Sequence, residues 1–300
     1  MRASAAATAA LATLLVSLIG CSAGSTESAT VKPSADGQAA SGYQPSGSSA
    51  RGLVESVARL VGSEHDPGQI TSGPVSFRDA EYYATIFNAG STTTFTAFAE
   101  VVRDVTVQPS SAATVIYRDA TTPTLLSDRD RTLWEKAGSP RLQPSRTGIM
   151  SFPSNHYSLL PQSVGLTYAA AQSLPASPAA MYSSIRKGLL SSGPGTLAQE
   201  MLNDLAFLLA TAPLTGKQLR AAWQAVSLIP NLQLCGTGED LSGRRGEGLC
   251  VSDGVQRTEV LLDPATAAIL GVKLTLLRAS TVYPGVAAGS VIQSDSLTRG

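Results

Sequence analysis

The chain has 300 residues, of which 43% are hydrophobic and 15% charged, and its 22 basic and 22 acidic residues balance each other. A chain of this length and composition can form one large domain or two small ones around a sizeable core. The balanced charge argues against a strongly basic surface, so we expect no nucleic-acid partner.

The first twenty residues have the organisation of a secretory signal peptide. Arg2 is their only charged residue, residues 5–19 are apolar or small, and small residues precede Cys21, which is the order of such a signal. The alternative is a transmembrane helix, but the apolar run is at the short end of the roughly 20 residues that a bilayer core requires. We therefore predict that residues 1–20 are removed from the mature protein.

The end of this signal carries a second pattern. Leu18, Ile19, Gly20 and Cys21 resemble the lipobox of bacterial lipoproteins. The resemblance implies that Cys21 is acylated and becomes the mature N-terminus. Because two or more acyl chains hold a protein on a bilayer far better than one, we expect the membrane to be a partner through lipid at Cys21. The predicted location is the extracytoplasmic face of the cell membrane.

A segment of low complexity follows the lipobox. Residues 22–50 are rich in Ser, Ala, Gly and Thr, and only Glu27, Lys32 and Asp36 are charged. Such a segment cannot bury enough apolar surface to offset the entropy of ordering it. We predict a flexible tether over residues 21–50 with a reach of roughly 30 Å, although a processing remnant without function fits the composition equally well. Residues 51–300 are then a single extracytoplasmic domain.

The predicted domain begins with a helix and continues with strands. Leu53, Val57, Leu60 and Val61 recur at helical spacing, and the following segments are rich in β-branched and aromatic residues. We predict a helix over residues 52–61, strands over 81–88, 93–107 and 113–118, and a further short strand around Trp134.

The middle of the chain predicts three helices. Ser177 precedes Pro178, and Thr196 with Gln199 and Thr215 with Gln218 have the spacing of capping boxes. The two helices that the capping boxes open carry apolar stripes, which either line a cavity for an apolar or lipid-like ligand or form ordinary core. The residues of the two stripes are Leu197, Met201, Leu205, Leu208, Leu219, Trp223 and Val226.

The last third returns to strands. We predict them over residues 232–235, 248–252, 257–263, 269–277 and 289–297, with a turn at residues 263–266. Strands, then helices, then strands is an α+β pattern, in which an antiparallel sheet packs helices on one face.

Two cysteines flank a Gly-rich loop in this part of the chain. Cys235 and Cys250 each lie in a short apolar stretch, which suggests neighbouring antiparallel strands joined by a disulfide. Closing a loop of this length contributes on the order of 3 kcal/mol in a compartment that permits oxidation. Two buried thiols are an alternative. A metal site would require further Cys or His ligands, so we expect none.

The C-terminal half also has a family resemblance. The segments "LRAAWQAVSLIPNLQL", "GEDLSGRRGEGL" and "EVLLDPATAAILG" resemble the C-terminal region of an uncharacterised actinobacterial family of membrane-anchored extracytoplasmic proteins. The order of elements is similar to that of the curved half-barrels of bacterial lipoprotein carriers and envelope-stress sensors. The resemblance implies a curved, half-barrel-like sheet and binding of an apolar ligand, and it supplies no catalytic residues.

Residues that could carry chemistry are few. His65 and His156 lie in polar, turn-like settings that suit surface histidines better than a general base. Residues 51–300 contain no Gly-x-Ser-x-Gly elbow between a strand and a helix and no phosphate-loop or dinucleotide motif, so we expect no cofactor. Other candidates have plainer alternatives. These are Asp128 with Asp130, a calcium site or a solvated turn, and Arg244 with Arg245, a contact for an anionic headgroup or an exposed loop.

Three hypotheses about function follow from the sequence. The first is a lipid-anchored, non-enzymatic module that binds an apolar or lipid-like ligand in the cell envelope. The second is a structural or signalling lipoprotein that acts through its surface, with a filled core and an exposed apolar patch. The third is a hydrolase without a recognisable motif, which would require a histidine or a carboxylate pair in a cleft.

Overall fold

The structure is a computed structural model that describes residues 49–63, 73–89, 93–110, 112–119, 123–140, 142, 148–160, 166–189, 196–283 and 285–299. All of these residues belong to one compact unit, Ala39–Gly300, which contains the whole of the apolar core described below. The predicted signal peptide, the lipidation of Cys21, nearly all of the tether and His65 lie outside the described residues.

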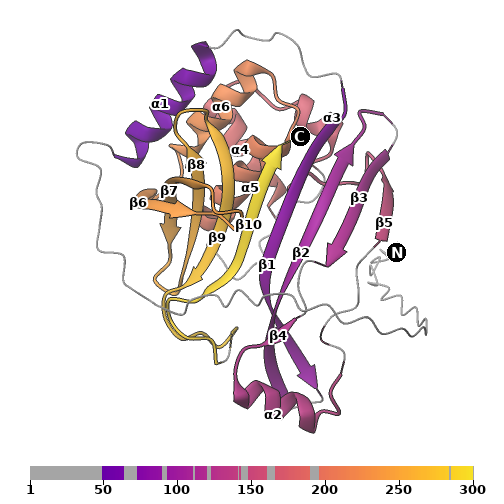
Figure 1. Cartoon of the computed structure of the whole chain (residues 1–300). Coiled ribbons are helices and arrows are strands. Elements are labelled where there is room, and N and C mark those ends of the chain that lie inside the picture. Colours follow the sequence, from indigo (N-terminus) through magenta and orange to yellow (C-terminus); the bar gives the residue numbers. More distant parts are fainter. Residues whose placement is uncertain are drawn as a thin grey trace, which may run out of the picture. The chain divides into compact units, whose positions relative to one another are not determined.

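The described strands form one open, curved antiparallel sheet (Figure 1), which confirms the predicted α+β architecture. The order across the sheet is β5-β3-β2-β1-β10-β9-β8-β7-β6, and β4 pairs with β2 beside β3. The strands are β1 (Val75–Ala89), β2 (Thr93–Val107), β3 (Ala112–Asp119), β4 (Thr124–Leu125), β5 (Gly148–Pro153), β6 (Gln233–Glu239), β7 (Arg245–Ser252), β8 (Gln256–Asp263), β9 (Ala268–Leu276) and β10 (Val291–Arg299).

At the centre of the sheet, the strands from the N-terminal part of the domain pair with those from the C-terminal part. β1 pairs antiparallel with β10, so that Asp79 lies opposite Leu297 and Glu81 opposite Asp295. β2 flanks β1 on the other side, with Arg103 opposite Asp79. The N-terminal and C-terminal groups of strands therefore meet at the β1–β10 pair, which Figure 1 shows side by side in indigo and yellow.

Three helices begin at the caps that the sequence predicts. Ser177 caps α4, and Thr196 and Thr215 form complete capping boxes with Gln199 and Gln218 at the starts of α5 and α6. Each box satisfies two backbone N–H groups that a helix end would otherwise leave unpaired. The described helices are α1 (Ala50–Ser63), α2 (Asp128–Lys136), α3 (Tyr168–Gln172), α4 (Pro178–Gly188), α5 (Leu197–Thr211) and α6 (Gly216–Val226). None of them is long and apolar enough to cross a bilayer.

One face of the sheet packs against these helices, and we call it the helix-side face. Phe77, Val105, Val260 and Leu297 lie on it and belong to the main apolar core, together with buried side chains of α5 and α6. Neighbouring residues in each strand point to the opposite, outer face. On the outer face of the N-terminal strands, Asp104 pairs with Arg78 and Arg118.

The sequence-based prediction of a strand around Trp134 is wrong, because this segment forms α2. Ser127 caps the helix, and its hydroxyl accepts a hydrogen bond from the Asp130 backbone N–H. Asp130 is only 1% exposed, and its Oδ1 accepts from the Thr96 N–H of β2 at 2.9 Å. The carboxylate therefore holds α2 against β2, and the solvated turn expected at Asp128 and Asp130 is also wrong.

Candidate functional site

Charged side chains gather on the helix-side face where β2, β1 and β10 lie side by side. Asp79 and Glu81 follow Phe77 at intervals of two along β1, so they share the face on which Phe77 enters the core. The strand register places Arg103 opposite Asp79 and Asp295 opposite Glu81. We call Asp79, Glu81, Asp295 and Arg103 together the carboxylate cluster.

The contacts within the carboxylate cluster place a single guanidinium against two carboxylates. Arg103 Nη2 pairs with Asp79 Oδ2 and, at 2.9 Å, with Glu81 Oε2. Gln293 of β10 links the remaining members, because its Nε2 donates to Asp295 Oδ2 at 3.2 Å and reaches Glu81 Oε1 at 3.5 Å. Three acidic side chains are thus gathered around one basic side chain.

Two oxygens of the cluster lack a hydrogen-bond partner. Asp79 and Asp295 are each 2% exposed, and among the described residues no donor reaches Oδ1 of either carboxylate. An unpaired buried acceptor costs about 1–3 kcal/mol, so proteins rarely retain one without a reason. The side chains of Glu81 and Arg103 are 21% and 30% exposed, which brings the cluster to the surface. The cluster therefore places buried acceptors next to two partly exposed charged side chains.

Burial shapes the acid–base behaviour of the cluster. Loss of hydration raises the pKa of Asp79 to about 6, against the pull of Arg103. Burial, together with the charges of Asp79 and Glu81, raises the pKa of Asp295 well above its ordinary value. Burial opposes the charge on Arg103, but the neighbouring carboxylates raise its pKa above the usual value. The cluster thus holds protons at a pH where exposed carboxyls are ionised.

Aromatic side chains continue from the cluster toward the edge strand β5. Tyr117 of β3 is the cross-strand neighbour of Arg103. Tyr157 is close enough that the charges of Arg103 and Asp79 affect it, while burial raises its pKa to about 12. Its ring lies 6.0 Å from that of Phe152, and Met150, two residues before Phe152 on β5, is 48% exposed. We call Tyr117, Tyr157, Phe152 and Met150 the aromatic strip.

The apolar stripes expected to line a ligand cavity lie mostly inside the core. Trp223 is 1% exposed, yet its Nε1 has no hydrogen-bond partner among the described residues. Leu219 packs against the core from its edge, whereas Leu197 is 40% exposed. Whether a ligand touches any of these side chains stays a prediction. The fully buried members are Met201, Leu205, Leu208, Trp223 and Val226.

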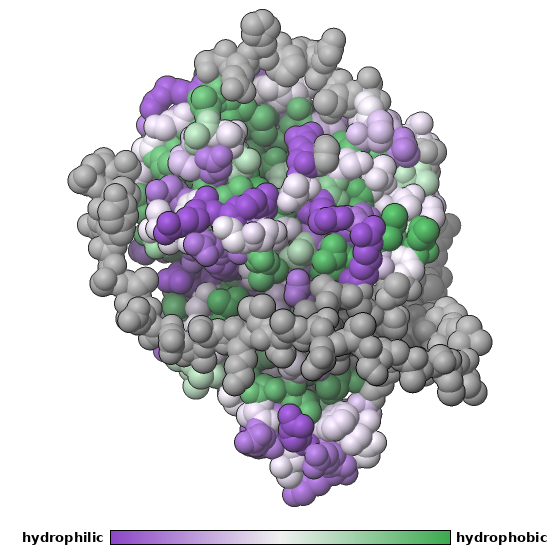
Figure 2. Space-filling view, viewed as in Figure 1, coloured by the Kyte–Doolittle hydropathy of each residue, from purple (hydrophilic) through white to green (hydrophobic). Residues whose placement is uncertain are grey.

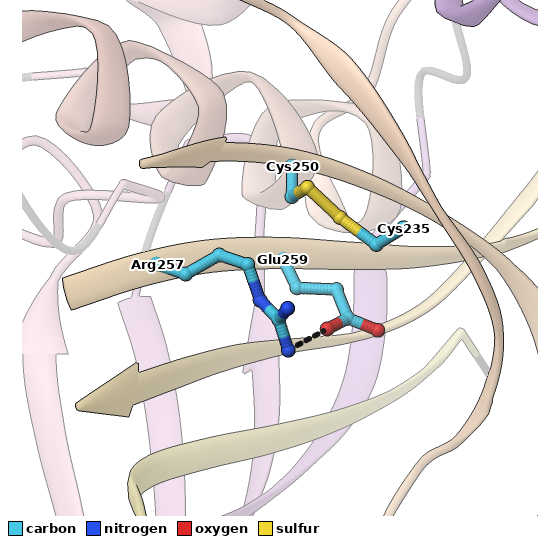
Figure 3. Close-up of a disulfide and its surroundings, with 4 residues drawn as sticks. All are labelled: Cys235, Cys250, Arg257 and Glu259. Carbon is cyan, nitrogen blue, oxygen red and sulfur yellow. Dashed lines mark ion pairs between the residues drawn. A yellow bond between two sulfur atoms is a disulfide. The ribbon is translucent and has the colours of Figure 1, made fainter. Parts of the chain in front are cut away.

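The predicted disulfide is present between β6 and β7. Cys235 and Cys250 are bonded, with their Cα atoms 6.1 Å apart. Cys235 lies at an irregularity in the pairing, next to Gly236, whose φ of 82° suits glycine. Glu259, the cross-strand neighbour of Cys250, pairs with Arg257 at 3.3 Å (Figure 3). The disulfide therefore ties the outermost strand to the strands that carry the core.

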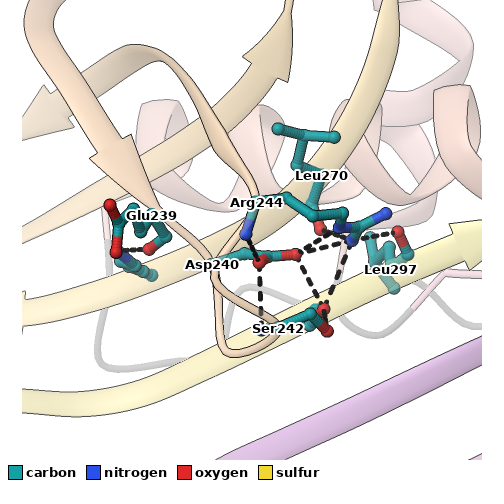
Figure 4. Close-up of polar contacts among 8 residues, drawn as sticks. Glu239, Asp240, Ser242, Arg244, Leu270 and Leu297 are labelled. Carbon is teal, nitrogen blue, oxygen red and sulfur yellow. Dashed lines mark hydrogen bonds and ion pairs between the residues drawn. The ribbon is translucent and has the colours of Figure 1, made fainter.

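The loop between the two cysteines is held by Arg244 and Asp240. The guanidinium of Arg244 pairs with the fully buried Asp240 carboxylate and donates to the carbonyls of Leu270 at 2.8 Å and Leu297 at 2.7 Å (Figure 4). These carbonyls lie just beyond the last β9–β10 pair, Gly271 with Ser296. Arg244 therefore bridges two diverging strands and is not the exposed loop residue considered above.

The remaining candidate residues, His156 and Arg245, are exposed and do not form part of a site. His156 is exposed in a turn and its backbone N–H donates to the Pro153 carbonyl. Arg245 is exposed and lies 3.5 Å from Glu239. The described residues contain no group of three or more His, Cys, Asp or Glu side chains placed to hold a metal ion. Figure 2 shows hydrophilic residues across the middle of the face that it views.

The carboxylate cluster was not predicted from the sequence, although the alternating pattern of one strand indicates part of it. Asp79 and Glu81 fall on the same face as Phe77 in an alternating strand, which marks charges at buried positions. The contribution of Arg103 and Asp295 depends on strand register and could not be predicted from the sequence.

Comparisons with known proteins give no family assignment. No protein-family model and no curated protein matches the chain. Two solved structures match at 13% and 14% identity: a crystal structure of MucB in complex with MucA(peri), and the MucA/MucB complex of Pseudomonas aeruginosa. Each alignment covers 84% of this chain but only 56% or 57% of the solved chain, with a TM-score of 0.23.

Proposed function

We propose that the chain is a lipid-anchored, extracytoplasmic binding protein that holds an amphiphilic, lipid-like ligand at the carboxylate cluster and the aromatic strip. The observation that carries the proposal is the pair of buried oxygens, Asp79 Oδ1 and Asp295 Oδ1, that lack a donor among the described residues and lie beside the partly exposed side chains of Glu81 and Arg103. Ligand sites are typically apolar surfaces with a few placed polar groups. The cluster supplies the polar groups and the aromatic strip the apolar surface.

The location in the proposal rests on the lipobox-like residues and on the disulfide. The lipobox-like residues Leu18 to Cys21 support an anchor, and the Cys235–Cys250 bond suits an oxidising compartment outside the cytoplasm. Radiolabelled palmitate tests the anchor directly. Label should enter the full chain and be absent from the Cys21→Ala variant, and equal labelling of both would reject lipidation at this residue.

Native mass spectrometry of the body, Ala39–Gly300, tests ligand binding. The protein is purified from a membrane-rich host and compared before and after organic extraction. We expect an added mass that extraction removes, and lipid analysis then identifies it. A polypeptide mass alone, lower by two hydrogens for the disulfide, would reject a tightly held ligand.

A second candidate is a protein that acts through its surface. It is favoured by β5, an edge strand on which Ile149 is 73% and Met150 48% exposed. Exposed edge strands accept an added strand from a partner. Replacing Ile149 with Lys would abolish such pairing and leave ligand binding unchanged, so pull-down of membrane proteins with and without this substitution separates the two candidates.

A further inference from the structure

We infer that the carboxylate cluster binds the protonated amine of a cationic amphiphile, with Asp79 and Asp295 as the accepting residues and the aromatic strip as the surface for the alkyl part. This inference rests on the proposed function and adds the charge and the hydrogen-bonding chemistry of the ligand. It follows from three properties of the site.

The first property is the excess of acceptors over donors. Arg103 pairs with Asp79 and Glu81, and Gln293 donates to Asp295. These contacts leave two buried carboxylate oxygens without a donor among the described residues. An ammonium group has three N–H donors and no acceptor, and charge-assisted hydrogen bonds to carboxylates are among the strongest in proteins. A ligand with this group supplies what the cluster lacks.

The second property is the sign of the charge. Three acidic side chains lie against one basic side chain, so an anionic ligand would meet repulsion from the cluster. A cation is attracted and shifts Asp79 and Asp295 toward their ionised forms, because an opposite charge nearby favours the charged state of a carboxyl. Binding of an amine should therefore release protons from the cluster when it occurs near neutral pH.

The third property separates an amine from a metal ion. Calcium takes six to eight oxygen ligands at about 2.3–2.6 Å, and the described residues contain no set of three or more Asp, Glu, His or Cys side chains placed to hold a metal ion. The members of the cluster are instead spread over three strands in two rows of cross-strand neighbours. Cross-strand neighbours lie too far apart for all of their oxygens to contact one metal ion. They suit a group that binds through hydrogen bonds, because the donor–acceptor distance of a hydrogen bond is longer than a metal–oxygen bond.

The aromatic strip supplies the surface for the alkyl part of the ligand. Tyr157 lies within electrostatic reach of Arg103 and Asp79, and its ring faces Phe152 at 6.0 Å. A cation over the face of a tyrosine ring is also attracted electrostatically by the quadrupole of the ring. The strip ends at Met150, whose flexible side chain adapts to different alkyl shapes. The arrangement therefore suits a ligand with an alkyl chain and a positive charge at one end of it.

The test compares four probes that share an eight-carbon chain. The body, Ala39–Gly300, is titrated by calorimetry with octylammonium, octyltrimethylammonium, octanol and octanoate. We expect octylammonium to bind at least about tenfold more tightly than octanol and octanoate. Octyltrimethylammonium, which keeps the charge but has no N–H donors, should bind with intermediate affinity. Titration in two buffers of different ionisation enthalpy should show proton release with both cations, larger for octylammonium because it also donates hydrogen bonds, and none with octanol.

Variants locate the binding. Asp79→Asn and Asp295→Asn should each weaken octylammonium at least about tenfold. Asp104→Asn, on β2 but on the outer face, serves as the matched control and should leave the affinity unchanged. Circular dichroism establishes that each variant is folded. The probe series needs no variant, so it decides the question even where a substitution prevents folding.

Each outcome has a distinct meaning. Equal or tighter binding of octanol or octanoate would overturn the inference about the amine and leave amphiphile binding in place. Failure of all four probes, together with a mass spectrum that shows no ligand, would overturn both the inference and the proposed function. Binding of octylammonium that is unaffected by Asp79→Asn and Asp295→Asn would also overturn it, because the amine would then lie elsewhere.

Discussion

Arg103 is the direct cross-strand neighbour of Asp79, and its guanidinium pairs with that buried carboxylate. The same nitrogen, Nη2, lies 2.9 Å from Glu81 Oε2. A single side chain on β2 therefore pairs with two acidic residues of β1, and we expect the stability of the central strands to depend on it.

Replacing Arg103 with Met should destabilise the body by about 3 kcal/mol at pH 8, because it leaves Asp79 buried without a counter-charge. The loss should be smaller at pH 5, where Asp79 can take up a proton. Urea unfolding at the two pH values measures both effects. Arg78→Met, at an exposed ion pair on the outer face, is the control and should cost much less. Equal losses for the two variants would contradict a central role for Arg103.

The stability of the body should increase as the pH falls from 7.5 to 5. The folded-state pKa of Asp79 is about 6, above its ordinary value of 3.8, and that of Asp295 is raised in the same direction. The folded chain therefore binds more protons than the unfolded chain in this window, so the contribution is present at low pH and is lost as the pH rises through about 6.

Other carboxyls act in the opposite direction at lower pH. Hydrogen bonds from Arg78 lower the pKa of Asp104. Burial opposes ionisation of Asp240, but hydrogen bonds from Arg244 lower its pKa too. Their contribution is lost as the pH falls below about 4. A thermal melting series should thus give a maximum near pH 5, and Asp79→Asn should flatten the change between pH 5 and 7.5. A melting temperature that rises steadily up to pH 7.5 would reject this account.

Removing the disulfide with the double substitution Cys235→Ser and Cys250→Ser should cost about 3 kcal/mol, since the bond closes a loop of 15 residues. Guanidinium unfolding of the two proteins gives the difference. Dithiothreitol should destabilise the parent by a similar amount and leave the double variant unchanged. A parent that is indifferent to the reductant would show that the bond adds little.

Arg244→Met should destabilise the body by about 2–4 kcal/mol, because it removes the counter-charge of the buried Asp240 carboxylate and the guanidinium donor to two strand carbonyls. Its neighbour Arg245 is 77% exposed, so Arg245→Met should cost less than about 1 kcal/mol. Hydrogen exchange adds a local readout, in which Arg244→Met should increase exchange near the β9–β10 divergence and Arg245→Met should not. Similar exchange in both variants would contradict the bridging role of Arg244.

Local patterns predicted most of the helices and strands. Capping residues such as Thr196 and Thr215 mark helix starts because they satisfy backbone groups within one turn, and strand 93–107 is apparent from its β-branched and aromatic residues. α2 was missed because it has few apolar residues to show a helical period. Its signal was the cap at Ser127, with Asp130 three residues later.

Long-range relationships could not be predicted in the same way. The carboxylate cluster needs the register of three strands, and that register depends on packing across the whole sheet. Arg244 looked like a surface residue because its partners, Asp240 apart, lie on β9 and β10. The sequence identifies the charged residues, but the distances between them depend on a strand register that the sequence does not specify.

The pairing of β1 with β10 makes the carboxylate cluster depend on strands that are far apart in the sequence. Glu81 and Gln293, which touch across this pair, are 212 residues apart. Contacts so distant in sequence form late in folding because a long loop must first close. A chain that stops before β10 lacks Asp295 and the central strand pair, and so has no carboxylate cluster. The ligand site that we propose therefore forms only once β1 and β10 have paired.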